Sequence, residues 1–176
     1  CLIFSNAGVC PNDLSEDRSN FVLTTIHRAE TLQNVDNVRN IFLAFLRVKQ
    51  PIIFPAHPNT YKFIVDNNIH IPENVSIIKP VSYFEMLWLL ERCSMVCTDS
   101  GGLQKEAYFM GKPCITLRNE TEWVELLESG WNVLTGYDSE KIINAFTHRF
   151  EKLNMPLYGD GDAAKKIMYQ IEKFLS

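Results

Sequence analysis

Short apolar runs alternate with amphipathic segments along the chain from Phe21 almost to its end. Runs of this length, rich in β-branched and aromatic residues, predict strands that are buried on both faces of a sheet. The expected strands are Phe21–His27, Pro51–His57, Val75–Pro80, Met95–Ser100, Pro113–Arg118 and Asn132–Thr135.

The segments between these strands carry apolar residues at the spacing of an α-helix. Gly111 and Gly130 mark two helix ends, because glycine suits the left-handed conformation that commonly follows a helix. The alternation predicts an α/β fold, in which a parallel sheet is covered by helices on both faces. The expected helices are Val35–Lys49, Asn59–Asn67, Tyr83–Cys93, Gly102–Met110, Glu122–Ser129, Ser139–Leu153 and Ala163–Phe174.

Length and composition indicate one globular domain. The 176 residues are 46% apolar and 22% charged, as expected for a folded domain with a single core. A formal net charge of −4 disfavours nucleic acid and anionic membranes as partners, and no apolar run is long enough to span a bilayer. Residues 1–20 are polar and lack an initiator Met, so we expect a connector from a preceding domain and a folded domain at 21–176.

The cysteine pattern predicts reduced thiols. There are five cysteines, an odd number, and three of them lie in apolar stretches, which is typical of a cytoplasmic protein. Cys93 and Cys97 have the spacing of half a zinc site, but no second Cys or His pair complements them. We therefore expect no metal and interpret both as small buried hydrophobes. The tryptophans, including Trp88, are expected to be packing residues.

Unusual polar residues lie where several predicted strands end. His27 and His57 end the first two strands, Ser100 the fourth and Arg118 the fifth. The carboxyl ends of parallel strands share one edge of a sheet, where helix N-termini offer unpaired N–H groups to ligands. We therefore expect the binding site at this edge.

Ser100-Gly101-Gly102 opens a predicted helix and suggests a diphosphate site. Two glycines remove the Cβ atoms that would keep an anion from the backbone, and the helix dipole favours a phosphate. Glu106 lies one turn further along the same helix face, where a carboxylate can accept hydrogen bonds from the hydroxyls of a ribose. The alternatives are an ordinary tight turn with Ser100 as N-cap, and a solvated Glu106 paired with a lysine.

Two further residue types at the sheet edge suit phosphate chemistry. Arg118 can supply a charge-assisted contact to a phosphate, or it can instead pair with Glu120 or Glu122. His27 is placed to carry a proton or to donate a hydrogen bond to a leaving diphosphate. His57 lies between prolines in a rigid loop, and spacing alone assigns it no role.

Motifs after Asn20 resemble, in order, those of the non-hydrolysing UDP-N-acetylglucosamine 2-epimerases. The resemblance implies a two-domain GT-B fold, of which this chain matches the C-terminal, Rossmann-like half, and a homodimer of full-length chains. The motifs are Thr25-Ile26-His27-Arg28-Ala29-Glu30-Thr31, Pro55-Ala56-His57-Pro58-Asn59, Thr98-Asp99-Ser100-Gly101-Gly102-Leu103-Gln104-Lys105-Glu106-Ala107, Gly111-Lys112-Pro113, Leu117-Arg118-Asn119-Glu120-Thr121-Glu122 and Tyr158-Gly159-Asp160-Gly161.

The resemblance also implies roles for the residues at the sheet edge. It assigns the diphosphate to Ser100, Gly101 and Gly102, the ribose hydroxyls to Glu106, and a phosphate to Arg118.

Four more residues match family positions with a role. His27 would lie near the diphosphate and be important for catalysis, and Val81 and Met86 would flank the uracil, although many members have Gln and Phe there. His57 matches a position linked to a second, activating UDP-sugar site in some bacterial members.

The implied reaction inverts C2 of a UDP-2-acetamido sugar, giving UDP-ManNAc for bacterial surface polysaccharides. It proceeds by anti elimination of UDP and re-addition, without a cofactor. The carboxylates that move the C2 proton belong to the N-terminal domain, so this chain alone is expected to bind UDP without epimerising it. Residues 121–125 read Thr-Glu-Trp-Val-Glu where many members read Thr-Glu-Arg-Pro-Glu, which resembles the branch acting on UDP-2,3-diacetamido-uronates.

Two other functions fit the same residues. The nucleotide-sugar half of a GT-B glycosyltransferase would also bind here but would need an acceptor. A non-catalytic, flavodoxin-like module would bind no sugar nucleotide and could be phosphorylated at Asp99. That residue stands beside Ser100-Gly101-Gly102 rather than in an acidic cluster, which disfavours the last interpretation.

Overall fold

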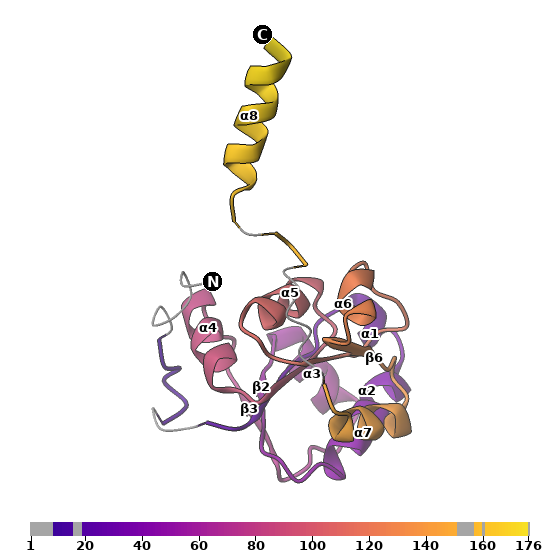
Figure 1. Ribbon diagram of the computed structural model, residues 1–176. Coiled ribbons are helices and arrows are strands. Elements are labelled where there is room, and N and C mark those ends of the chain that lie inside the picture. Colours follow the sequence, from indigo (N-terminus) through magenta and orange to yellow (C-terminus); the bar gives the residue numbers. More distant parts are fainter. Residues whose placement is uncertain (1–8, 16–18, 151–156, 160, 176) are drawn as a thin grey trace.

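A six-stranded parallel sheet, in the order β3-β2-β1-β4-β5-β6, forms the centre of the computed structural model (Figure 1). The structure describes residues 9–15, 19–150, 157–159 and 161–175. The predicted α/β fold with a parallel sheet is confirmed. The strands are β1 (Val22–Thr25), β2 (Ile52–Pro55), β3 (Val75–Ile78), β4 (Met95–Thr98), β5 (Cys114–Thr116) and β6 (Asn132–Leu134).

The strands stop earlier than the sequence pattern predicts. His27, His57, Ser100 and Arg118 all lie in the loops that follow the strands. The backbone leaves the ladder at these points to enter a helix or turn, as at Ser100, which becomes the N-cap of the helix that follows β4. His27, His57 and Ser100 are therefore free of the sheet and lie at its edge, whereas Arg118 is buried there.

Helices cover both faces of the sheet, and most follow the prediction closely. One short helix, α1, was not predicted, because four residues carry no helical periodicity. The helix α7 ends at Thr147, well before the predicted Leu153, because His148 adopts an extended backbone; residues 151–153 lie outside the described residues. The helices are α1 (Ala29–Leu32), α2 (Val35–Leu46), α3 (Pro58–Asp66), α4 (Tyr83–Arg92), α5 (Gly101–Phe109), α6 (Val124–Glu128), α7 (Ser139–Thr147) and α8 (Ala163–Leu175).

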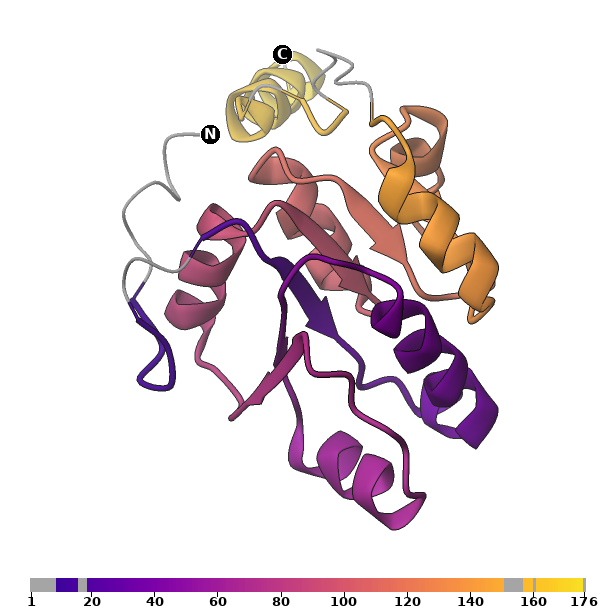
Figure 2. The same ribbon diagram turned by 90° about the horizontal axis from the view of Figure 1, so that it is seen from below.

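Alternate residues of each strand feed two separate apolar clusters. Val22 and Ile52 pack with α2, α3 and α7, whereas Leu23 and Ile53, their next neighbours in sequence, pack with α4 and α5. Figure 2 shows α4 and α5 on one side of the sheet and α2 and α7 on the other. Burial on both faces explains why the strands read as continuous apolar runs.

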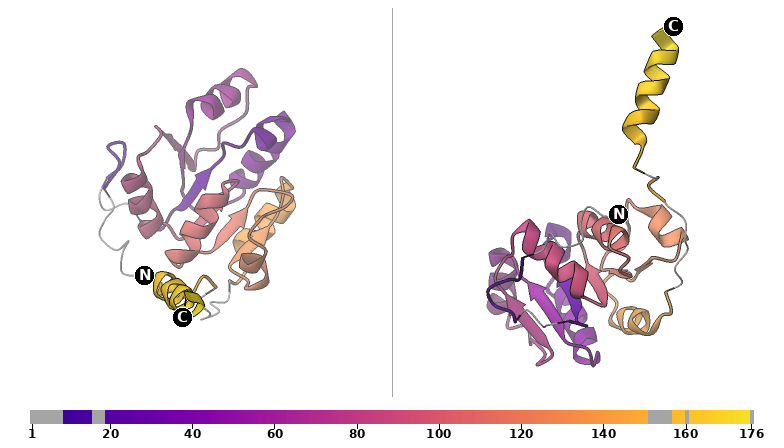
Figure 3. Two further views of the ribbon diagram at one scale, coloured as in Figure 1. Left: turned by 90° about the horizontal axis from the view of Figure 1, so that it is seen from above. Right: turned by 60° about the vertical axis from the view of Figure 1, so that its left-hand side comes forward.

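The two ends of the chain behave differently. In the predicted connector, Val9 donates its N–H to the carbonyl of Phe84, and Cys10 and Leu14 pack against the α4 cluster. By contrast, α8 projects away from the sheet, with Phe174 90% exposed (Figures 1 and 3). The boundary at residue 20 stays a prediction. Among the described helices, none is both long and apolar enough to cross a membrane.

Three of the described cysteines are free thiols in the core. Cys93, Cys97 and Cys114 are buried, as expected of small hydrophobes, and Cys10 is half-buried, while Cys1 lies outside the described residues. Burial raises the pKa of Cys93 and of Cys114 to about 12, so these thiols are inert at neutral pH. Within the described ranges, no group of three or more His, Cys, Asp or Glu side chains is placed to hold a metal ion.

Candidate functional site

A cavity of about 660 Å³ opens at the carboxyl ends of β1 to β4. It lies where the chain order reverses: β2 and β3 extend the sheet from one side of β1, and β4 to β6 extend it from the other. Ligands of open parallel sheets bind at such a switch point. The cavity wall includes seven of the nine predicted site residues, namely His27, His57, Val81, Met86, Ser100, Gly102 and Glu106.

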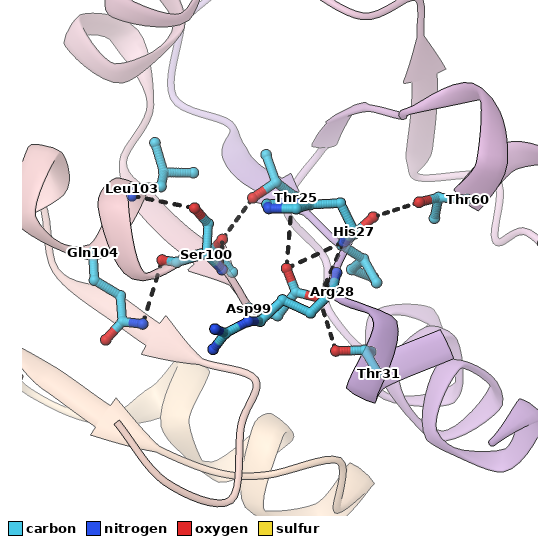
Figure 4. Close-up of polar contacts among 11 residues, drawn as sticks. Thr25, His27, Arg28, Thr31, Thr60, Asp99, Ser100, Leu103 and Gln104 are labelled. Carbon is cyan, nitrogen blue, oxygen red and sulfur yellow. Dashed lines mark hydrogen bonds and ion pairs between the residues drawn. The ribbon is translucent and has the colours of Figure 1, made fainter. Parts of the chain in front are cut away.

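A fully buried carboxylate, Asp99, organises the β1 side of this cavity (Figure 4). It accepts hydrogen bonds from the backbone N–H of His27 at 3.1 Å and of Arg28 at 3.0 Å, and from Thr31 Oγ1 at 2.8 Å. A buried carboxylate is tolerated only when its oxygens are satisfied in this way. The chain therefore uses Asp99 to fix the turn between β1 and α1.

The same carboxylate orients the His27 ring. His27 Nδ1 lies 3.5 Å from Asp99 Oδ1, and the side chain is 48% exposed. A carboxylate at Nδ1 favours a proton on that nitrogen, which leaves Nε2 for the cavity. The orientation of the His27 imidazole at the cavity wall is therefore fixed by Asp99.

Ser100 and the two glycines form the start of α5. Ser100 Oγ accepts from the Leu103 N–H at 3.4 Å, so Ser100 is an N-cap, as the tight-turn alternative supposes. Gly102 also faces open space, since a Cβ there would have no neighbour nearer than Ser100 Oγ at 4.0 Å. The helix N-terminus is thus capped on one side and open to the cavity on the other.

Gly101 serves a different purpose from Gly102. A Cβ on Gly101 would collide with the carboxylate of Glu122. Gly101 is therefore the point at which the segment after β5 approaches α5, and it is not on the cavity wall.

Glu106 lies on the cavity wall, one turn beyond Gly102. Burial raises the pKa of its carboxyl group, because the charged form loses hydration. In the described part of the chain no lysine forms an ion pair with Glu106, which favours the interpretation as a ligand-binding carboxylate over the Glu–Lys pair. A half-buried carboxylate without a cation is suited to accept hydrogen bonds from a ligand hydroxyl.

Arg118 is buried and pairs with Glu122. Its Nη1 lies 2.5 Å from Glu122 Oε2, so the ion-pair alternative for Arg118 is realised. Arg118 is absent from the cavity wall, and its Nε is buried without a hydrogen-bond partner among the described residues.

His57 and the pair Val81 and Met86 lie on the far wall. His57 is the N-cap of α3, where its Nδ1 accepts from the Asn59 N–H at 3.2 Å. An accepting Nδ1 places the ring hydrogen of a neutral imidazole on Nε2. Val81 and Met86 flank the start of α4, where they supply the apolar part of the wall.

Sequence reasoning missed two contributors to the site. The structural role of Asp99 has no signal in the sequence beyond its place between Thr98 and Ser100 at the end of an apolar strand. Trp123 was expected to be a packing residue, but its Nε1–H donates to the Gly101 carbonyl at 2.8 Å, and the Lys105 ammonium lies 3.5 Å from its ring centroid. Trp88 is buried in the core as predicted.

The strand order, the cavity at the switch point and the glycine turn at a helix N-terminus define a Rossmann-like α/β domain. The sequence profile of the family described as UDP-N-acetylglucosamine 2-epimerase matches residues 6–172, so the chain belongs to that family.

Two curated relatives support the assignment. A UDP-N-acetylglucosamine 2-epimerase homolog from Methanococcus maripaludis is 41% identical, over 89% of this chain and 46% of its own length. The UDP-2,3-diacetamido-2,3-dideoxy-D-glucuronate 2-epimerase of Pseudomonas aeruginosa is 38% identical, over 98% of this chain and 49% of its own length.

A solved structure shows the same fold. The Methanocaldococcus jannaschii UDP-GlcNAc 2-epimerase, crystallised with UDP-GlcNAc and UDP, superposes with a TM-score of 0.77 at 33% identity. The match covers 88% of this chain and 46% of that one. The chain thus spans about half the length of the relatives it matches.

We predict that Asp99 is a main determinant of domain stability. Asp99→Ala should lower the free energy of unfolding by about 2–4 kcal/mol, because two backbone N–H groups and a hydroxyl lose their acceptor. Thr31→Val, which removes only one donor, should cost about 1 kcal/mol. Urea unfolding of the three proteins checks this order, and equal midpoints for wild type and Asp99→Ala would contradict it.

We also predict that Glu106 lowers stability at neutral pH. A carboxyl whose pKa is raised on folding is more costly to ionise in the folded state, so the cost is present above the folded pKa and absent below the ordinary value of 4.5. Glu106→Gln should therefore raise the unfolding midpoint at pH 7 and lose this gain at pH 3.5 or below. The exposed Glu120→Gln serves as the control, and a gain that persists in acid would refute the explanation.

Proposed function

We propose that this chain is the UDP-binding, C-terminal half of a non-hydrolysing UDP-N-acetylglucosamine 2-epimerase. The observation that carries the proposal is the arrangement on α5: an open helix N-terminus at Gly102, with the half-buried Glu106 one turn away on the same cavity wall. A diphosphate fits the first and a ribose diol fits the second. Family membership and the UDP-bound relative support it.

Three further wall residues, together with Arg118 behind the wall, complete a nucleotide site in this proposal. Val81 and Met86 offer an apolar surface for the base at the entrance to α4. Ser100 places its hydroxyl at the start of α5, and Arg118 supplies positive charge behind the glycine turn. Elimination of UDP develops negative charge on the diphosphate, and donors already fixed in place stabilise such charge.

His27 would act on the same diphosphate. Its ring is held by Asp99 at Nδ1 and Nε2 is available to the cavity, so the protonated imidazolium can donate a hydrogen bond or a proton from Nε2 to the leaving group. The carboxylates that remove and return the C2 proton would come from the half of the polypeptide that this chain does not include. We expect the full-length protein to be a cytoplasmic homodimer, which the buried, free thiols suit.

A second substrate is favoured by one observation. The Pseudomonas relative, which acts on UDP-2,3-diacetamido-2,3-dideoxy-D-glucuronate by its name, matches 98% of this chain, and residues 121–125 carry the sequence variant of that branch. The modified sugar is therefore the alternative substrate. A glycosyltransferase function is disfavoured by the family assignment.

Calorimetry tests the nucleotide site. We expect UDP to bind more tightly than ADP or inorganic diphosphate, because the base and ribose both contribute. Gly102→Ala should weaken UDP binding about tenfold or more, since the new methyl group points into the space for the phosphate, while helix propensity keeps the fold at least as stable. Equal affinities for all three ligands, or no effect of Gly102→Ala, would overturn the proposal.

We predict that the chain on its own binds UDP and does not epimerise. Incubation with UDP-GlcNAc in deuterium oxide should give neither UDP-ManNAc nor deuterium at C2, because the carboxylates that move the C2 proton are proposed to lie in the other half. UDP binding by the same sample shows that the domain is folded. Deuterium incorporation at C2 would mean that the reacting carboxylate lies in this chain.

A further inference from the structure

The segment after β5 is held tightly against the start of α5. Thr121 Oγ1 donates to Gln104 Oε1 at 2.9 Å, and Trp123 Nε1 donates to the Gly101 carbonyl at 2.8 Å. Glu122 lies between these two anchors. Its carboxylate is therefore directed to the glycine turn, where it occupies the space beside Gly101.

The surroundings of Glu122 are those of an anion site. Oε2 pairs with Arg118 Nη1. The pKa of Glu122 is lowered mainly by a hydrogen bond from its own backbone N–H, and then by the hydrogen bond and charge of Arg118 and by the charge of Arg28. Each of these arginines also has a buried nitrogen without a hydrogen-bond partner in the described part of the chain, Nε in Arg118 and Nη1 in Arg28. The glycine turn adds the positive end of the α5 dipole.

Exposure decides which member of the ion pair can move. The side chain of Arg118 is 8% exposed, whereas that of Glu122 is 43% exposed. Arg118 is thus fixed by burial, while Glu122 can turn toward solvent at little cost. An incoming phosphate would meet a cation whose charge is already balanced unless Glu122 leaves.

We propose that Glu122 is a resident anion of the phosphate site, which a diphosphate displaces from Arg118 and the glycine turn. This rests on the proposed function for the identity of the ligand. Glu122 therefore sets the affinity of the site: its departure opens Arg118 to the diphosphate, and its return helps to expel the product. A binding site tuned in this way holds UDP less tightly than its donors alone would allow.

The test compares Glu122→Gln with Glu120→Gln. Both substitutions remove one negative charge from the same segment, but only Glu122 contacts Arg118, and Glu120 is exposed. Calorimetry with UDP and with inorganic diphosphate should show about fivefold tighter binding for Glu122→Gln than for Glu120→Gln. Thermal unfolding confirms that both variants are folded.

The other outcomes of the calorimetry separate the role of Glu122 from the proposed function. Equal or weaker binding by Glu122→Gln would show that the carboxylate serves only to orient Arg118, and would overturn the proposal. If the Glu122→Gln protein binds diphosphate more tightly but discriminates UDP no better than ADP, the resident anion stands and the UDP function fails. Absence of binding to either ligand by both variants and the wild type overturns both.

Discussion

The site depends on one buried carboxylate at the switch point of the sheet. Asp99 leaves β4 and satisfies the backbone of the turn that leaves β1, so the two neighbouring strands end in a single hydrogen-bonded unit. Thr25 and Thr98 add a hydroxyl contact of 2.6 Å immediately beneath it. Both His27 and the start of α5 take their positions from this unit, which is why the cavity lies over β1 and β4.

A short polar relay extends this unit into the glycine turn. Thr98 Oγ1 accepts from the Ser100 N–H at 2.9 Å, and Ser100 in turn caps α5. The backbone at the helix N-terminus is therefore fixed before any ligand arrives. Donors held in place need little reorganisation on binding, which is the condition for a stabilised leaving group.

The sheet and its helices could be predicted because both faces of every central strand are buried. Leu23 and Ile53 pack on one face and Val22 and Ile52 on the other, so the pattern is apolar without interruption and easily recognised. The exact strand ends could not be predicted, since polar residues such as His27 follow the last ladder bond directly. The short helix α1 was not predicted, because a tertiary contact to Asp99 defines it and not a helical periodicity.

Those site residues were predictable whose type and spacing fit few structural roles. A glycine pair at a helix start and a glutamate one turn later indicated Gly102 and Glu106, and both line the cavity. The roles of Asp99 and Trp123 were not predictable, because each depends on a partner far away in sequence. The pairing of Glu122 with Arg118, four residues away, was one of the predicted alternatives. Arg118 shows the limit clearly: its contact with a phosphate stays a prediction, because the structure buries it off the cavity wall and pairs it with Glu122.

The most direct test of this account is a crystal structure of the chain with UDP. The account predicts the diphosphate at the N-terminus of α5 beside Gly102, the ribose hydroxyls on Glu106, and the Asp99 contacts to His27 and Arg28 unchanged. UDP bound elsewhere on the domain, or a turn between β1 and α1 that rearranges and releases Asp99, would contradict the claim that this carboxylate preorganises the site.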